Sequence, residues 1–567
     1  MQIGVAKKEI PVQVPGIGMF GWGVPTNFVE ASATAVHARA FFLESSGQTA
    51  AIVSCELLCI SQAISEAVLE RLRTEHAELG LNHRNLMLLA THTHSAPGGY
   101  SAYPFYALEA PGFSPQILED ITSTIVDALR EAWQSREAGE IRFDQGEFAA
   151  EDRVAYNRSP LSWNRNPETP DITWETRHLG IDRRMKLLRF DSLSRGCIGT
   201  INFFGVHGTS VHSDNRKVHF DNKGYAATLL EEANGSNFVG AFAQATTGDV
   251  TPNFQQHPGK PWTRGMYPDD DASARYTGEL QQAKAHEILQ SAAAQPALAD
   301  QVISAHRYRD FSAIDVDPAF TDGVPGRRTA PGKLGMAMFF GTDEGPGMPR
   351  NLLFLQSIAQ KVRPFWRLVP RSKRARLKQK AHDETHAEKV TVMELAHHRF
   401  LGIRSLRKLP IGKNPNPILR MIRKMDPHGL AEPKPWTPQI LPAQLLIIGS
   451  VAIAAIPHEM TTTSGQRVEE MLQKELRPLG VETVIVAGYA NAYAGYVTTP
   501  EEYAVQDYEG ASTHFGKWTL PGWMTVFAEL ARETTREAAP ADGLRPPSFT
   551  AQDLEGRLYE PWTKNPD

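Results

Sequence analysis

Five apolar runs along the chain each end abruptly in a polar or Gly/Pro-rich turn. The runs are short and rich in Val, Ile, Leu, Phe and Ala, which is typical of strands buried on both faces. With the turns that follow them they are NLMLLA–THTHSAPGG (85–99), CIGTINFFGV–HGTSVHSDN (197–215), NFVGAFAQA–TTGDVTPNF (237–254), QLLIIGSVAIAAI–PHEMTTTSG (444–465) and VETVIVAG–YANAYAGYVTTPEE (481–502). Within the fourth run, Gly449-Ser450 predicts a tight hairpin turn.

Amphipathic helical patterns lie between these runs. Apolar residues recur with the period of one helix face in residues 61–76, 114–135, 274–294 and 464–476. Buried strands that alternate with helices predict an α/β fold, with a mixed, largely buried β-sheet flanked by helices. Ligand sites of such sheets gather beyond the carboxyl ends of the strands, so we expect the polar turns to form one site.

The length of the chain allows several domains, or one large enzyme domain with insertions. The chain has 567 residues, of which 41% are hydrophobic and 22% charged, and its formal net charge is −5. This balance gives no support to a nucleic-acid-binding or a membrane protein, and no apolar window of about 18 residues predicts a membrane span. The N-terminus lacks the pattern of a signal peptide, so we expect a cytoplasmic protein, or a secreted or periplasmic one if a leader was removed.

A basic segment interrupts the α/β pattern between residues 351 and 426. Residues 361–380 contain nine Lys or Arg residues, no acid, and the aromatic pair Phe365-Trp366. The favoured interpretation is a solvated insertion, and the alternative is peripheral contact with an anionic membrane surface. Nucleic acid is not expected, because no base-stacking or groove-reading motif accompanies the cluster. The predicted organisation is a catalytic domain over 1–530 with a basic variable insertion at 351–426, and a C-terminal extension over 531–567.

The turn after the first run carries two histidines one residue apart, His92 and His94. A strand directs alternate side chains to one face, so both imidazoles are expected to point the same way. Neutral imidazole is a common metal ligand, and two on one face make half of a metal site. On these residues alone, a hydrogen-bonded pair of turn histidines is an equal alternative.

Seven segments, taken together and in order, resemble the neutral (alkaline, non-lysosomal) ceramidase family. They are THTHSAPGGY (91–100), NRSP (157–160), VHGTSVHSDNRKVHFDNKGYA (206–226), TTGDVTPN (246–253), GTDEGPG (341–347), PHEMTTTSGQRV (457–468) and NAYAGYVTTPEEYAVQDYEGAST (491–513). The resemblance implies a zinc-dependent amidase that cleaves the N-acyl bond of ceramide, or of a related N-acyl lipid, to a fatty acid and a sphingoid base. No protein partner is predicted.

The resemblance also implies roles for individual residues. One zinc ion per chain would be bound by His92, His207, Glu459 and Tyr496. Two imidazoles and a carboxylate, with a position left open for water, suit a catalytic zinc. His94 and Arg158 would donate to the scissile carbonyl oxygen as negative charge develops on it. Asp249 and Thr251 would position the substrate or pass a proton to the leaving amine.

The sequence departs from the family pattern in three places. Thr251 replaces a family serine taken as nucleophile or hydroxyl donor, and its methyl group stiffens χ1. We therefore expect attack by zinc-bound water, whose pKa zinc lowers to about 7. Ala96 replaces a family glycine, and the chain ends at residue 567, too soon after the last motif for the β-sandwich that closes typical members.

Three other interpretations fit parts of the sequence. The same zinc site could act on a different amide or ester. A TIM-barrel amidohydrolase also has a His-x-His strand, but usually near its N-terminus, and with His and Asp ligands where this chain has Glu459 and Tyr496. A catalytically weak or zinc-free lipid-binding relative is suggested by Thr251 and the short C-terminus, but all four expected ligand positions are retained.

Overall fold

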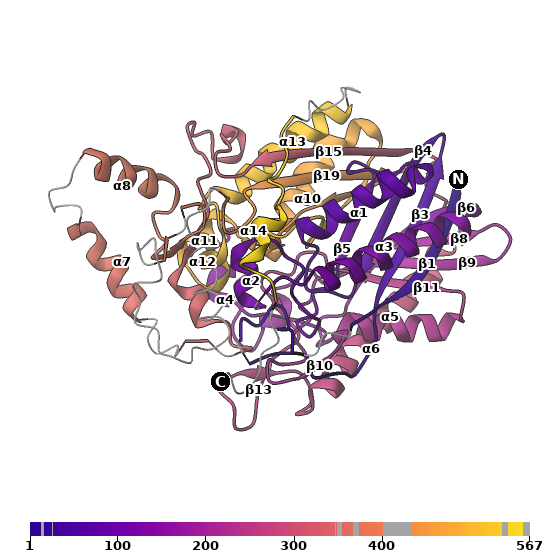
Figure 1. The fold of residues 1–567 in the computed structure, drawn as a ribbon, viewed down its shortest axis with the longest axis horizontal. Helices are drawn as coiled ribbons and strands as arrows, with labels where there is room; N and C mark the ends of the chain where they lie inside the picture. The colour runs from indigo at the N-terminus through magenta and orange to yellow at the C-terminus, as the bar shows by residue number, and fades with distance from the viewer. Residues whose placement is uncertain are drawn as a thin grey trace.

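The fold is built on two β-sheets that pack face to face (Figure 1). The structure is a computed structural model that describes residues 1–559 except 13–15, 25, 111, 346, 349–353, 367–372, 398, 401–433 and 536–542. The sequence analysis predicted the α/β class correctly, and the buried strands are divided between the two sheets.

The larger sheet has eight strands in the order β11-β9-β8-β6-β1-β3-β4-β5. Their bounds are β1 Gln2–Ile10, β3 Val36–Ser45, β4 Gln48–Cys55, β5 Leu86–Ala90, β6 Glu137–Glu147, β8 Arg184–Ser192, β9 Gly196–Phe203 and β11 Val239–Ala243. The sheet is mixed: β4 with β5 and β9 with β11 are parallel, whereas β1, β3, β6 and β8 form antiparallel pairs. It is open, so the described strands form no closed barrel, which excludes the TIM-barrel interpretation.

The smaller sheet has four strands in the order β15-β19-β20-β22. Their bounds are β15 Val302–Asp310, β19 Ile440–Ile448, β20 Val451–Ala455 and β22 Thr483–Ala487. The last residue of β19, Ile448, pairs with Val451 of β20, so the hairpin predicted at Gly449-Ser450 is confirmed. Strand β22 lies parallel to β20.

Alternation along the strands divides the side chains between two hydrophobic cores. In β3, Phe41 and Leu43 face the other sheet, whereas Ala40 and Phe42 face helices. In β20, Val451, Ile453 and Ala455 face the larger sheet, and Ala452 and Ala454 face helices. Two buried faces explain why these runs are apolar throughout. The result is a four-layer body, helix–sheet–sheet–helix.

Helices cover both outer faces. Those on the larger sheet are α1 Gln62–Glu75, α3 Pro115–Gln134, α5 Asp221–Asn234 and α6 Asp270–Ala292, and those on the smaller sheet are α10 Thr462–Leu476 and α13 Thr519–Thr535. All four predicted helices are confirmed, as α1, α3, α6 and α10. Ser61 and Ser114 cap α1 and α3 by accepting the backbone N–H three residues on, as Ser does at helix starts.

Short elements build the end of the body where the parallel strands terminate. The paired strands are β2 Ala31–Ser32, β7 Tyr156–Asn157, β10 Lys217–Val218, β12 Val250–Thr251, β13 Gln255–Gln256, β14 Thr263–Arg264, β16 Lys333–Gly335, β17 Thr391–Glu394, β18 Arg399–Phe400, β21 Glu459–Met460 and β23 Tyr496–Val497. The helices are α2 Pro104–Glu109, α4 Pro160–Trp163, α11 Pro500–Val505, α12 Tyr508–Ser512 and α14 Ala551–Glu555.

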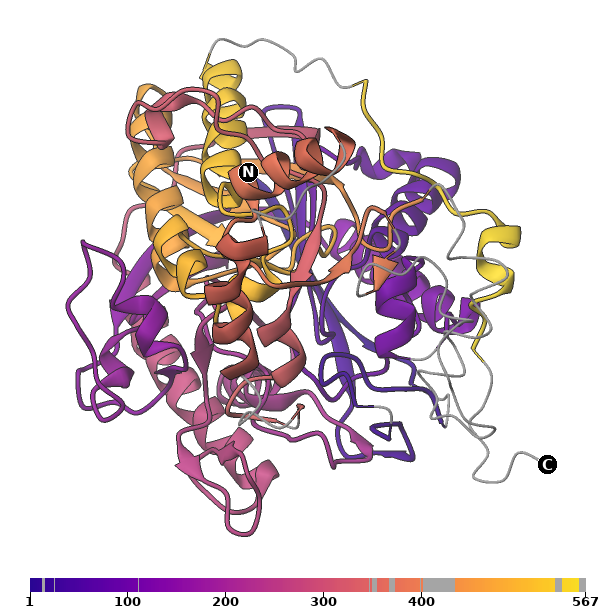
Figure 2. The same ribbon diagram turned by 90° about the vertical axis from the view of Figure 1, so that its left-hand side faces the viewer.

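Two helices of the predicted basic insertion project from this end of the body (Figures 1 and 2). They are α7 Phe354–Trp366 and α8 Lys373–Thr385. Most basic side chains of 361–380, and the Phe365-Trp366 pair, lie outside the described side chains. Helix α13 runs through the boundary predicted between residues 530 and 531, so the packed body continues to Thr535.

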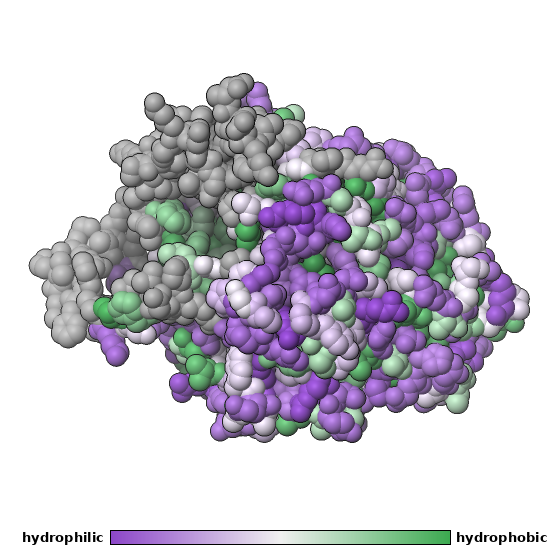
Figure 3. Space-filling view, turned by 90° about the horizontal axis from the view of Figure 1, so that it is seen from below, coloured by the Kyte–Doolittle hydropathy of each residue, from purple (hydrophilic) through white to green (hydrophobic). Residues whose placement is uncertain are grey.

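No helix within the described ranges is both long and apolar enough to span a membrane. On the face seen in Figure 3, hydrophobic residues form small patches among polar ones.

Candidate active site

Three buried histidines meet beyond the carboxyl ends of the larger sheet. His92 and His94 follow β5, and His207 follows β9. Their ring nitrogens lie within 4.8 Å of one another, and His92 Nε2 is 3.1 Å from His94 Nε2. The predicted convergence of the two imidazoles is therefore confirmed, but it arises in the loop after β5, which ends at Ala90, and not from alternation along a strand. A third imidazole joins them from the loop after β9.

Close backbone contact brings the two histidine loops together. His94 N–H donates to the carbonyl of Gly208 at 3.0 Å, and a Cβ on Gly208 would lie 2.4 Å from the carbonyl oxygen of His92. Only glycine permits this approach. His92 itself has φ of +68°, an uncommon conformation for a residue other than glycine. Such strained residues gather at functional sites because the surrounding structure must hold them.

Backbone carbonyls fix the orientation of two of the rings. Nδ1 of His92 lies 2.8 Å from the carbonyl of Leu58, and Nδ1 of His207 lies 2.8 Å from that of Val250. Since a carbonyl only accepts, each Nδ1 carries the proton and, in the neutral ring, each Nε2 presents a lone pair to the centre. Burial lowers the pKa of His92 to about 3 and holds the pKa of His94 well below its ordinary value, so both rings are neutral at pH 7.

A carboxylate from the smaller sheet completes the cluster. Glu459 follows β20, and its Oε2 lies 3.0 Å from His207 Nε2 and 3.5 Å from His92 Nε2. The hydroxyl of Tyr493 donates to Oε1 and that of Tyr489 to Oε2, the latter at 3.2 Å. Burial alone would raise the pKa of Glu459, but positive charge at His92 or His207 and the hydrogen bond from Tyr493 outweigh it and hold that pKa well below its usual range.

This donor arrangement fits a metal cation. In their neutral forms His92 and His207 direct lone pairs at the negative oxygen of Glu459, and that arrangement is repulsive unless a proton or a metal cation lies among them. Metal-binding histidines ordinarily donate their other N–H to a carbonyl, as both do here. The histidine group can therefore hold a metal ion.

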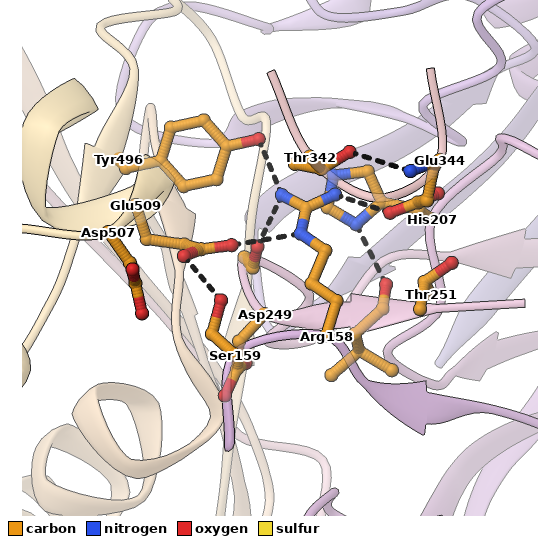
Figure 4. Close-up of polar contacts among 12 residues, drawn as sticks. Arg158, Ser159, His207, Asp249, Thr251, Thr342, Glu344, Tyr496, Asp507 and Glu509 are labelled. Atoms are coloured by element: carbon orange, nitrogen blue, oxygen red, sulfur yellow. Dashed lines mark hydrogen bonds and ion pairs between the residues drawn. The ribbon is translucent and has the colours of Figure 1, made fainter. Parts of the chain in front are cut away.

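Arg158 is bonded on several sides, including to the hydroxyl of Tyr496 (Figure 4). It donates to Tyr496 Oη at 3.0 Å, to Glu344 at 2.8 Å and to Glu509 at 2.9 Å. It also donates to the carbonyl of Gly248 at 2.8 Å. Tyr496 lies beside Glu459 because β23 pairs with β21 in parallel, with these two residues opposite each other. Arg158 thus orients Tyr496 toward the cluster.

Asp249 and Thr251 bond to neighbouring backbone and side chains. Asp249 accepts from Asn157 and from both the N–H and the hydroxyl of Thr462, at the start of α10. Thr251 Oγ1 accepts the N–H of Asn253 at 2.8 Å. Both residues are buried, and each holds a loop that carries part of the site.

A small cavity opens in front of the cluster. It holds about 50 Å³ and is lined by His92, His94, Glu459 and Tyr496. The rest of its wall is largely aromatic or apolar and includes Phe105, Tyr106, Leu334, Met338, Tyr493 and Tyr508. Such a wall suits a substrate with an apolar chain.

Comparison with known proteins gives the family. The family model described as "Neutral/alkaline non-lysosomal ceramidase, N-terminal" matches residues 1–401 and 410–525. The chain belongs to this ceramidase family. Neutral ceramidase A of Dictyostelium discoideum is 31% identical over 565 residues, covering 94% of this chain and 72% of the relative. Neutral ceramidase of Pseudomonas aeruginosa is 32% identical over 553 residues, covering 95% and 73%.

A solved structure extends the similarity to three dimensions. The structure titled "Ceramidase complexed with C2" superposes with a TM-score of 0.78 at 31% identity, covering 96% of this chain and 77% of the other. The fold described here is therefore that of the ceramidase family.

Four residues of this ceramidase-family site were not singled out from the sequence. They are Glu344 and Glu509, which pair with Arg158, and Tyr489 and Tyr493, which donate to Glu459. The two glutamates stand inside the GTDEGPG and YEGAST motifs, and the tyrosines recur in YANAYAGY with Tyr496. The place of these residues inside motifs that carry the family resemblance would have been the available signal.

Proposed function

We propose that this chain is a zinc-dependent amidase that hydrolyses the N-acyl bond of ceramide, or of a closely related N-acyl lipid, to a fatty acid and a free amine. The observation that carries the proposal is the convergence of His92, His207 and Glu459, of which His92 and Glu459 line an aromatic-walled cavity. Membership of the ceramidase family supports the substrate class.

Zinc suits the donor set, because two imidazoles and a carboxylate are typical zinc ligands. His92, His207 and Glu459 would hold it, and Tyr496 is proposed as a fourth ligand. Bound zinc would polarise the amide carbonyl and lower the pKa of water.

The protein's own groups prepare the site for that chemistry. Tyr489 and Tyr493 hold the Glu459 carboxylate, and Arg158 holds the Tyr496 hydroxyl. His94 faces the cavity, where it can contact the carbonyl oxygen of the substrate. Arg158 is satisfied by Glu344, Glu509 and Tyr496, so its role is proposed to be positioning of Tyr496 rather than direct donation to the substrate.

The test combines metal analysis with product identification. The purified protein should contain close to one zinc per chain and release equal amounts of fatty acid and amine from N-dodecanoyl sphingosine, as detected by mass spectrometry. His207→Ala should lose the metal and at least a hundredfold in rate, whereas His76→Ala, at the end of α1, should lose neither. Full activity of His207→Ala would refute the site, and turnover confined to other amides or esters would refute the substrate.

We also propose that residues 361–380 contact anionic membranes. Phe354 and Ile358 lie one turn apart on α7 and are 54% and 48% exposed, close to the exposed Lys361. Apolar side chains beside cations are typical of interfacial helices.

Charge reversal at Arg371, Lys373, Arg374 and Arg376 tests this contact. The variant should bind anionic vesicles more weakly, most clearly at low salt, while its hydrolysis of a short-chain soluble substrate is unchanged. Equal losses on soluble and vesicle-borne substrates would instead place the segment in the wall of the active site. Unchanged binding at low salt would indicate that the segment is a solvated insertion without membrane contact.

A further inference from the structure

A second cavity lies between α8 and the three-stranded sheet β16-β17-β18. It holds about 590 Å³, and it is lined by one face of α8, by Ala359 of α7 and by β16 and β17. None of its described lining residues belongs to the lining of the catalytic cavity. The two cavities lie on opposite sides of β16, because Lys333 faces this one and Leu334 faces the catalytic one.

Basic groups gather in the lining of this second cavity. They are Lys333, His382, His386, Lys389 and His397. Lys333 Nζ lies 3.0 Å from His382 Nδ1, and the rings of His382 and His386 stack with centroids 5.8 Å apart. The only carboxylate among the described lining residues is Glu394, which lies 4.0 Å from Arg399. A concave surface lined by one sign of charge concentrates ions of the opposite sign.

The remainder of the lining is apolar apart from a few polar side chains. Ala330, Pro331, Ala359, Ala381 and Val390 contribute aliphatic surface. Thr391 also lines the cavity, and its buried Oγ1 has no hydrogen-bond partner among the described residues. A buried hydroxyl without a partner is costly, and an anionic oxygen would accept its proton.

Burial disfavours the charged forms of two of the basic groups. Burial lowers the pKa of His386 and of Lys389 well below their ordinary values, and Lys333 lowers both further. The Lys389 ammonium and the His386 ring are bonded within the protein, to the carbonyls of Ala511 and Pro331 among others. An anion in the cavity would therefore act on Lys333 and His382, because an opposite charge within a few ångströms favours the charged form of a basic group. The cavity is therefore better matched to an anion than to a neutral ligand.

We propose that this cavity binds the anionic head of a single-chain amphiphile, a carboxylate or a phosphate monoester. Lys333, His382 and the Thr391 hydroxyl contact the head, and the alkyl chain lies against the aliphatic part of the lining. The proposal does not depend on the hydrolytic function, since no residue of the catalytic cavity takes part.

Titration calorimetry with decanoate and decyl phosphate tests the site. Each should bind the full-length protein at this site, and the double variant Lys333→Met/His382→Gln should lower the affinity at least tenfold. The matched control is Lys380→Met, which removes a cation from the same helix outside the lining and should change affinity less than twofold. Each substitution is also tested singly, and a loss of binding counts only in a variant that keeps the wild-type Tm.

Further ligands measure separately what the anionic head and the alkyl chain of the amphiphile contribute to binding. Decanol should bind at least tenfold more weakly than decanoate, and inorganic phosphate at least tenfold more weakly than decyl phosphate. Tighter binding of decanoate would assign a fatty-acid ligand, and tighter binding of decyl phosphate a phospholipid-derived one. The proposal is overturned if folded single variants bind like wild type, or if decanol binds as tightly as decanoate.

Discussion

At the scale of single residues, the orientation of His94 depends on packing. Its Nε2 contacts His92, but its buried Nδ1 has no hydrogen-bond partner among the described residues. The ring is held between the edge of Trp22, with centroids 5.1 Å apart, and the backbone of Gly21. A Cβ on Gly21 would lie 2.5 Å from His94 Nδ1, so the absence of a side chain there makes room for the imidazole.

Gly21→Ala should therefore displace His94. Overpacking of this kind costs about 1–3 kcal/mol, and we expect at least a tenfold loss of hydrolysis together with a lower Tm. Gly23→Ala is the matched control, since Gly23 also has positive φ but no atom lies within 4 Å of the position that a Cβ would occupy there. Equal effects of the two substitutions on hydrolysis would show that backbone strain, and not the contact with His94, is responsible.

Substitutions of Thr251 distinguish two roles for its hydroxyl, that of a structural hydrogen-bond acceptor and that of a nucleophile. Its Oγ1 accepts the N–H of Asn253, which is a structural contact. Thr251→Ser keeps that acceptor and should hydrolyse the substrate at close to the wild-type rate. Thr251→Ala should lose about 1 kcal/mol of stability but retain measurable turnover. An acyl-threonine intermediate trapped in a single turnover, or complete inactivity of folded Thr251→Ala, would instead identify the hydroxyl as the nucleophile.

At the scale of elements, the N-termini of two helices, α10 and α11, each bind a buried acidic side chain, and these two acids interact. Asp249 accepts from the first residue of α10, and Glu502 closes the capping box of α11 with Thr499. Burial raises the pKa of Asp249 to about 6, and burial together with Asp249 raises the pKa of Glu502 to about 7. The charged forms are thus disfavoured in the folded protein.

This pair should make the fold less stable as pH rises toward neutrality. A carboxyl whose folded pKa is raised contributes stability below its unfolded pKa of about 4.3, and this contribution is lost as pH rises to the folded value. Glu502→Gln should therefore become progressively more favourable, relative to wild type, between about pH 4.5 and 7. Urea unfolding across that range measures the difference in unfolding free energy between variant and wild type. The control is Glu501→Gln on the same helix, because Glu501 pairs with Arg467 near the surface. A difference that stays constant with pH would contradict the prediction.

At the scale of the whole molecule, the proposed metal ligands come from both sheets. His92 and His207 follow strands of the larger sheet, and Glu459 follows a strand of the smaller one. A ligand that binds only the folded state stabilises it in proportion to its binding free energy. Metal binding should therefore strengthen the joint between the sheets as well as enable chemistry.

Removal of the metal should lower Tm, and zinc should restore it. Calorimetry before and after chelation measures the effect, which at a metal concentration of 100 times Kd corresponds to about 2.7 kcal/mol. His207→Ala should melt at the same temperature with and without chelator. If a chelated sample that metal analysis shows to be empty keeps the wild-type Tm, the metal does not link the sheets.

The sequence by itself determined the strands and helices, and the polar residues that follow the carboxyl ends of the strands. Two-faced burial forces a run such as LMLLA to be apolar throughout, so the strands were visible without any partner. Helix periodicity and serine caps likewise act within one segment. Polar turns directly after such strands predicted a shared site, and the resemblance of their motifs to the ceramidase family selected His92, His207 and Glu459 as ligands.

Only the tertiary structure decided which groups meet and in what state. Division of the strands into two sheets depends on pairing between segments far apart in the sequence, as when β15 joins β19, and local pattern does not encode it. The same is true of Arg158, which contacts Glu344, Glu509 and Tyr496 from three segments distant in the sequence. The tautomer, burial and pKa of a side chain depend on its neighbours in space. The sequence therefore identified the histidines as candidates, and the tertiary structure brought them together.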